Sequence, residues 1–231
     1  MEFDKTQYEV RSVPYSEAKE WVLCKHYAHR IPPISFAFGL YRNESWGGHL
    51  SFCLCGVCTF GPPASHDLIV GAMGEDYTFN FLELNRLVVN DGLPRNALSF
   101  FVSQCLKALP KPMVIISYAD SGMGHHGYIY QATNWVYTGL SKPHVDMLPE
   151  NMTDAHPRTI SQQSVEEWKS KTNLVKVERA RKHRYFQFLG DKRQKRKMLH
   201  DLKFPIVKEY PKGDNERYDA SYEVSPNGVL F

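Results

Sequence analysis

The chain has 231 residues, 42% of them hydrophobic and 13% aromatic, which is enough for a large packed core and excludes a disordered protein. No apolar run approaches the roughly 18 residues of a membrane-spanning helix, and the charged first residues lack the apolar segment of a signal peptide. We therefore predict a cytoplasmic protein without a membrane span. The net charge is +3, but residues 176–203 contain eleven Lys and Arg against three acids, a local net of +8.

In chain order, the first half of the sequence alternates between strand and helix patterns. Short apolar or alternating runs predict strands, and apolar residues three and four apart predict helices. The predicted elements are a strand at 8–13, a helix at 15–26, a hairpin of strands 34–41 and 50–60 around a turn at 43–48, a long loop at 61–77, a strand at 79–90 and a helix at 97–109.

The stretch 113–139 carries the strongest functional signal. A short apolar run at 113–116 predicts a buried strand, and the polar residues Ser117 and Asp120 follow it at once. Three glycines within residues 122–127 surround two histidines and allow a sharp turn or a close approach to a ligand. Polar side chains where a strand ends are typical of ligand sites in α/β proteins. The alternative is a glycine-rich connector whose tyrosines only fill the core.

The C-terminal third combines polar, basic and aromatic stretches. A helix is predicted to begin at Tyr128 and a last strand to end near Gly139, followed by a polar loop at 142–158 and a helix at 159–168. Aromatic residues then lie between cations at 181–190, and a second helical pattern begins at 192. We predict a catalytic core at 1–145 and a basic extension at 146–231 that packs on the core, has the charge expected of a polyanion-binding region and ends in a flexible tail.

Three cysteines lie close together at Cys53, Cys55 and Cys58. A Cys-x-x-Cys pair can hold zinc, but no second pair lies at the spacing of a zinc site. Cys53 and Cys55 point to one face of a strand, so packing is favoured over metal binding.

The order of strands and helices resembles the acyltransferase fold of the GNAT superfamily, a mixed β-sheet flanked by helices. That resemblance implies that a phosphate-bearing acyl donor sits at the helix following the fourth strand, where backbone N–H groups are free. The usual glycine-rich loop is replaced by the residues from Arg95 to Ser99, so we expect ordinary acetyl-CoA binding to be compromised. The predicted cofactor-binding residues are Leu87, Val88, Arg95, Asn96, Ala97 and Ser99, and the donor is left open between acetyl-CoA and another activated acyl or aminoacyl compound.

Several motifs together resemble the phage Mom family of DNA modification proteins. They are Lys25-His26-Tyr27, the segments 84–87, 117–120 and 124–135, Lys182 to Tyr185, and the Tyr-Pro-Lys-Gly at 210–213. The resemblance implies an enzyme that converts adenine in double-stranded DNA to its N6-carbamoylmethyl derivative and so shields phage DNA from host restriction. It also implies a small-molecule or carrier-bound acyl donor, and a role for iron has been suggested for the family.

The exocyclic amine of adenine is a poor nucleophile, so a base or polariser near it and stabilisation of charge on the donor are needed. The candidates are Asp120, which the resemblance favours as a partner of the amine, and Tyr130, at the place where GNAT enzymes often carry a general acid. The alternatives are a loop-capping aspartate and a core tyrosine. His26 and Tyr27 are candidates for holding the base or a metal, and Ser117 completes the set.

An adenine inside a duplex cannot present its N6 to a buried pocket, so base flipping is expected, with Tyr27, Phe36 or Trp46 stacking on the extruded base. The predicted DNA-binding residues are Lys182, Arg184, Tyr185, Arg193, Lys195, Arg196 and Lys197; the alternative is a solvated helix face. Two other functions stay open at this point: a GNAT acetyltransferase acting on a protein or small amine, and a non-catalytic DNA-binding protein.

Overall fold

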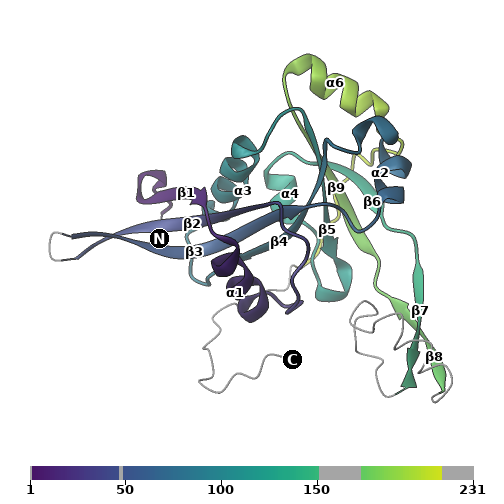
Figure 1. The fold of residues 1–231 in the computed structure, drawn as a ribbon, viewed down its shortest axis with the longest axis horizontal. Coiled ribbons are helices and arrows are strands. Elements are labelled where there is room, and N and C mark those ends of the chain that lie inside the picture. Colours follow the sequence, from purple (N-terminus) through teal and green to yellow (C-terminus); the bar gives the residue numbers. More distant parts are fainter. Residues whose placement is uncertain (1, 47–48, 151–172, 215–231) are drawn as a thin grey trace.

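The structure is a computed structural model that describes residues 2–46, 49–150 and 173–214. Its described strands form a seven-stranded mixed sheet in the order β1-β2-β3-β4-β5-β9-β6 and a separate two-stranded sheet, β7-β8 (Figure 1). The predicted mixed α/β class is confirmed. The expected helix at 159–168 and the tail beyond residue 214 lie outside the described residues.

The first four strands form an antiparallel meander: β1 (Tyr8–Ser12), β2 (Phe36–Trp46), β3 (His49–Gly61) and β4 (Phe81–Val89). The predicted hairpin is confirmed, but β2 continues through the expected turn to Trp46. The expected long loop is wrong in part, because it contains α2 (His66–Ala72) and a 3-10 turn, η2 (Glu75–Tyr77). Ser65 starts α2 by accepting a hydrogen bond from the Leu68 N–H at 3.3 Å, a common helix start.

The centre of the sheet is a parallel pair that separates. The helix α3 (Ala97–Ala108) connects β4 to β5 (Met113–Asp120), and these strands pair only from Phe81 opposite Val114 to Glu83 opposite Ile116. Beyond Glu83, β4 stays with β3 while β5 stays with β9. The carboxyl ends of β4 and β5 therefore diverge, and ligands bind at such ends in α/β sheets.

The basic segment supplies an interior strand of this sheet. β9 (Lys182–Leu189) lies antiparallel between β5 and β6 (Val136–Leu140). Tyr185 and Phe186 are fully buried, so aromatic residues on both faces of β9 fill the core despite the neighbouring cations. Part of the expected polar loop is also a strand, because β7 (His144–Pro149) pairs with β8 (Leu174–Arg179).

Helices cover both faces of the sheet. α3 and α4 (Tyr128–Ala132) pack on one face in the main cluster, which contains Phe101 and Trp135. α2 and α6 (Lys192–Asp201) cover the opposite face of β5 and β9, and α1 (Tyr15–Lys25) packs on a smaller cluster around Val57. The remaining 3-10 turns are η1 (Lys5–Gln7) and η3 (Ser121–Met123).

The five cysteines are all free thiols. Cys55 and Cys58 pack in the interior, whereas Cys53 is exposed. In the described ranges, no helix is long and apolar enough to cross a membrane.

Candidate active site

A pocket of about 840 Å³ lies where β4 and β5 diverge. Its volume falls within the range typical of small-molecule sites. It is lined by segments distant in sequence: His26 and Tyr27, residues 84–87 of β4, the stretch from Val89 to Ser99 that leads into α3, Tyr118 and Ala119 of β5, and residues of the glycine-rich loop and α4 between 125 and 132. The sequence motifs at 25–27, 84–87 and 124–135 therefore meet at one site.

A bulge in β4 turns the 84–87 motif toward the pocket. Leu84 lies opposite Phe60 and Arg86 opposite Thr59, so Asn85 is the extra residue of β4. The Asn85 amide is fixed between the Thr59 hydroxyl, which donates to it at 2.6 Å, and the Pro33 carbonyl, which accepts from it at 2.9 Å. Bulges are common beside active sites, where they redirect side chains.

Tyr130 reaches the pocket from α4, and its hydroxyl lies 2.7 Å from the Ser117 hydroxyl. The Ser117 hydroxyl is 2.8 Å from the Leu84 carbonyl, which can only accept. Since a serine has one hydroxyl proton, Ser117 donates to Leu84 and Tyr130 donates to Ser117. Burial raises the pKa of Tyr130, so its hydroxyl stays protonated at neutral pH. Ser117 is 1% exposed and lies behind Tyr130, so it positions the phenol and does not reach the pocket.

His26 follows the end of α1 and is 5% exposed. Burial, together with the nearby cations Arg86 and Lys182 and the histidines at 29 and 125, lowers the pKa of His26 to about 3, so the ring is neutral at pH 7. Its Nδ1 accepts the Ala28 N–H at 3.0 Å, which leaves the proton on Nε2. His26 is therefore a hydrogen-bond donor through Nε2, and its Nδ1 is already occupied.

Tyr27 is stacked on His26 with ring centroids 4.3 Å apart, and its other neighbour is His125 at 5.7 Å, edge to face. Burial and then the negative charge of Asp120 raise the pKa of Tyr27, and Arg86 opposes that effect. The stacked pair forms a flat aromatic wall of the pocket. Phe36, another expected stacking residue, packs in the main cluster, and the side chain of Trp46 lies outside the described part of the structure.

Asp120 is the last residue of β5 and does not line the pocket. Successive side chains of a strand point to opposite faces, so Asp120 shares the face of Tyr118, which lines the pocket two residues earlier, while Ser117 and Ala119 face Tyr130. Its carboxylate pairs with the Lys182 ammonium at 2.9 Å and accepts the Gly122 N–H at 3.0 Å. The loop-capping role is thus observed, and Asp120 also acts on the pocket through its charge beside Tyr27.

The other end of the pocket is the start of α3. Arg95, Asn96 and Ser99 line it together with Leu87. Asn96 is the residue before the helix, with a left-handed φ of 80°, and its side chain does not cap the helix. Two of the expected residues do not reach this site. Val88 and Ala97 are both buried, and Val88 packs in the cluster that α1 covers.

Arg86 and His125 line the pocket but were not among the predicted site residues. Arg86 lies in the 84–87 motif, and its guanidinium donates to the Arg30 carbonyl from Nε at 3.3 Å and from Nη2 at 3.1 Å. It thereby ties the chain after α1 to β4 and lowers the pKa of His26 by its charge. His125 contacts Tyr27 across the pocket. In the sequence, Asn85 and Arg86 interrupt the apolar pattern of the strand, which could have indicated Arg86 as a site residue. The face of the strand on which the Arg86 side chain lies could not be predicted.

Comparison with known proteins identifies the family. The Mom protein family matches residues 7–212, which is most of the chain. The chain belongs to the Mom protein family. A curated relative, methylcarbamoylase Mom of Escherichia phage Mu, is 28% identical over 127 residues, covering 53% of this chain and 49% of that protein. The match thus spans about half the length of this relative.

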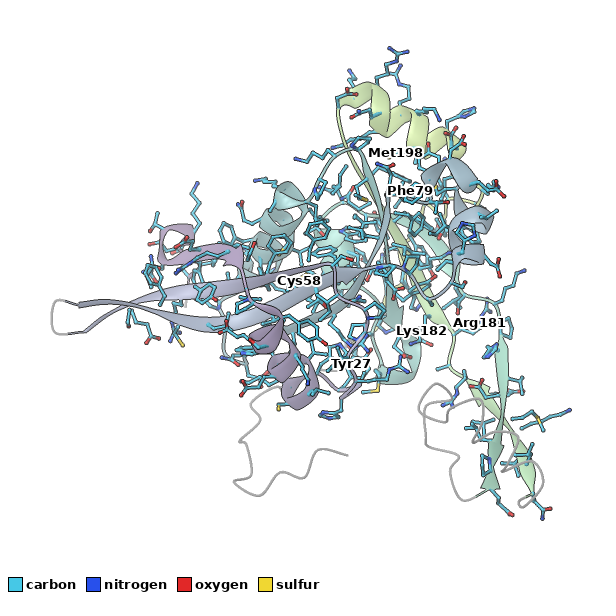
Figure 2. The ribbon with its side chains drawn as sticks, in the orientation of Figure 1. Tyr27, Cys58, Phe79, Arg181, Lys182 and Met198 are labelled. Carbon is cyan, nitrogen blue, oxygen red and sulfur yellow. The ribbon has the colours of Figure 1, made fainter. Side chains whose placement is uncertain are left out.

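Within this Mom-family chain, the expected DNA-binding residues separate into two groups. Arg184 and Tyr185 are buried: the Arg184 Nε donates to the Thr138 hydroxyl at 2.8 Å, and its guanidinium lies 3.4 Å from the centre of the Phe204 ring. The interior position of β9 therefore removes both residues from DNA contact. Lys182 is exposed beside Asp120, near Tyr27, whereas Met198 marks α6 at the far end of the molecule (Figure 2).

The iron suggested for Mom proteins has no evident cluster of ligands in the described ranges. Among these residues no three His, Cys, Asp or Glu side chains are grouped to hold a metal ion. His26 already accepts a backbone N–H through Nδ1, and Asp120 is engaged by Lys182 and Gly122.

Proposed function

We propose that this Mom-family protein transfers a carbamoylmethyl, or related acyl-type, group to the N6 amine of adenine in double-stranded DNA. The observation that carries the proposal is the convergence of three family motifs on one pocket of small-molecule size. The 28% identical relative bears the name methylcarbamoylase, and a GNAT-like acyltransferase architecture is part of the proposal.

The acceptor side is the wall formed by His26 and Tyr27. A flipped adenine stacks on Tyr27, an aromatic surface that replaces the base stacking of the duplex. His26 stacks against Tyr27 as a neutral ring, and a neutral ring costs less than a cation when a base covers it. Asp120 is a positioning residue in this scheme, because its charge acts on Tyr27 and it holds Lys182 at the pocket rim.

The donor side runs from Tyr130 to the start of α3. The N6 lone pair forms a bond to the electrophilic carbon of the donor while the bond to the leaving group breaks. N6 releases one proton to solvent, the leaving group gains one from Tyr130, and Tyr130 regains a proton from solvent, so the overall proton count is unchanged. Arg95 and the free N–H groups of the first turn of α3 stabilise negative charge on the donor.

Nucleoside mass analysis tests this proposal. DNA from cells that express the protein should contain an adenine derivative heavier by a carbamoylmethyl group, and DNA from cells expressing a Tyr130→Phe variant should lack it. An unmodified nucleoside pool with acetylated protein or small amines would favour an ordinary acetyltransferase, and duplex binding without any modification would leave only a DNA-binding protein.

A further inference from the structure

We propose that the β7–β8 arm lies in a groove of the duplex beside the pocket and holds the DNA while the adenine is flipped. The arm is defined as residues 141–149 and 174–181. It projects from the sheet as a two-stranded ribbon, clear of the helices (Figure 1). This inference rests on the proposed function, since DNA is its partner.

The arm emerges directly from the pocket rim. β6 ends at Leu140 and β9 begins at Lys182, so β7 and β8 continue this antiparallel pair beyond the sheet. At the root, the Ser141 N–H donates to the Lys182 carbonyl at 2.8 Å, and the Lys182 N–H donates to the Ser141 hydroxyl at 2.9 Å. Ser121, which follows Asp120, donates its backbone N–H to the Arg181 carbonyl at 3.3 Å. The arm is therefore fixed to the loop that builds the site.

The size of the arm suits duplex DNA. A two-stranded β-ribbon fits the major groove. Six residues separate Ser141 from Met147, which at about 3.3 Å per residue is roughly 20 Å, or about six base pairs. An adenine in the pocket and a groove contact on the arm can thus belong to one short stretch of duplex.

The charges of the arm also suit a polyanion. Its described residues include four Lys and Arg against two acids, and Asp146 is paired with Arg179. Lys142, Lys176 and Arg181 are exposed, and Glu178 is the acid that remains on the surface. A positive ribbon beside the site attracts phosphates and releases their counterions.

One face of the arm presents two exposed apolar side chains opposite two charged ones. Val145 and Met147 are each 47% exposed, and their cross-strand partners are Glu178 and Lys176. Directly opposed residues of an antiparallel pair share a face, so two apolar side chains lie between a cation and an acid. In the major groove, apolar side chains can contact the methyl groups of thymine, which suits an exposed valine and methionine on a ribbon that lies there.

The test is duplex binding by purified full-length protein, measured by fluorescence anisotropy on a mixed-sequence duplex at several salt concentrations. Replacing Lys142 and Lys176 by Ala should lower affinity several-fold and reduce the salt slope by about two, one for each phosphate that is no longer neutralised. Glu178→Gln removes an opposing charge and should raise affinity, a gain that a folding defect cannot produce. An unchanged or lower affinity of Glu178→Gln would overturn the inference.

Substitution of the two exposed apolar side chains of the arm has a matched control. Val145→Ser with Met147→Ser should weaken duplex binding and modification, whereas Phe79→Ser, at a side chain 92% exposed elsewhere on the surface, should change neither. Equal effects of the two variants would refute the arm's role. Sedimentation of the wild type and of the Val145→Ser, Met147→Ser variant tests whether the arm instead contacts a second copy of the chain. A dimeric wild type together with a monomeric variant would also refute the role of the arm in DNA binding.

The arm and the proposed function can fail separately. If the arm variants lose duplex binding and the wild type produces no modified adenine, the role of the arm in DNA binding stands and the proposed enzyme activity is refuted. If the arm variants bind and modify DNA as well as the wild type does, only the role of the arm is refuted. A wild-type protein that binds no duplex would overturn both.

Discussion

Tyr130→Phe removes one oxygen from the centre of the site and is the sharpest test of the chemistry. The deleted hydroxyl is the donor to Ser117 at 2.7 Å, and Ser117 keeps its bond to the Leu84 carbonyl at 2.8 Å. The ring itself stays, and it packs against Trp135 and Tyr185 at centroid distances of 5.0 Å. The substitution therefore deletes a proton donor with little change in packing.

The two roles of this hydroxyl differ in magnitude. Losing a neutral hydrogen bond costs about 0.5–1.5 kcal/mol of the free energy of unfolding. Domains are stable by about 5–15 kcal/mol, so nearly all Tyr130→Phe molecules remain folded. Losing a general acid costs about 10²–10⁴ in rate, equivalent to about 2.7–5.4 kcal/mol in the barrier. A purely structural Tyr130 therefore predicts almost full activity, and a catalytic one predicts a loss of at least about a hundredfold.

The assay measures modified adenine and the thermal midpoint on the same proteins. Tyr137→Phe is the matched control, because its hydroxyl is also buried in the aromatic cluster, 2.7 Å from His183 Nδ1, and does not line the pocket. Both variants should show a similar, small fall in midpoint, and only Tyr130→Phe should lose modified adenine. Equal activity of the two variants would refute the role of Tyr130 as proton donor.

Three further predictions concern charge. Asp120→Asn keeps an acceptor for the Gly122 N–H but loses the charge that pairs with Lys182. Folding and duplex affinity should therefore persist while the amount of modified adenine falls. An unchanged amount of modified adenine would exclude Asp120 from the mechanism. The pKa of His26 lies at about 3 in the folded chain against 6.5 ordinarily, so the unfolded chain binds the extra proton between these values. The stability that His26 contributes is complete above pH 6.5 and is lost toward pH 3, with a slope of at most about 1.4 kcal/mol per pH unit. His26→Asn, which keeps an acceptor for the Ala28 N–H, should therefore show a shallower loss in acid unfolding curves, and an identical slope would contradict this. The exposed cations of α6 to be neutralised together are Arg193, Lys195, Arg196 and Lys197. Their loss should lower affinity for all duplex sequences alike and flatten the salt dependence of binding, measured by anisotropy. An unaltered salt slope would contradict a role of α6 in DNA binding.

Hydrophobic periodicity predicted most of the elements that build the pocket. The strands at β4 and β5, the helix α3 between them and the turn of helix at Tyr128 all lie close to the expected ranges. The separation of β4 from β5 was not readable, because it depends on which partner each strand keeps beyond residue 83. The pocket is a consequence of that long-range pairing.

The interior strand β9 was the main feature that the sequence concealed. Lys182 and Arg184 suggested a solvated extension, since buried cations are rare. Arg184 is accommodated by Thr138 and by the ring of Phe204, neither of which is close in sequence. The position of Asp120 was misjudged for a related reason. β5 continues four residues past the apolar run, and one residue of register decides the face on which a side chain lies.

The placement of β9 also divides the basic segment among different tasks. Its eight residues span roughly 25 Å at about 3.3 Å per residue, so the pocket end at Lys182 and the α6 end are separated by more than the width of a duplex groove. Phosphates beside a flipped adenine contact Lys182, Arg181 and the arm, whereas phosphates at α6 lie about seven base pairs farther along the duplex. Exposed charges far from a docked site act mainly on the rate of encounter, and groups in contact act on dissociation. The four α6 substitutions should therefore slow association, whereas those in the arm should speed dissociation.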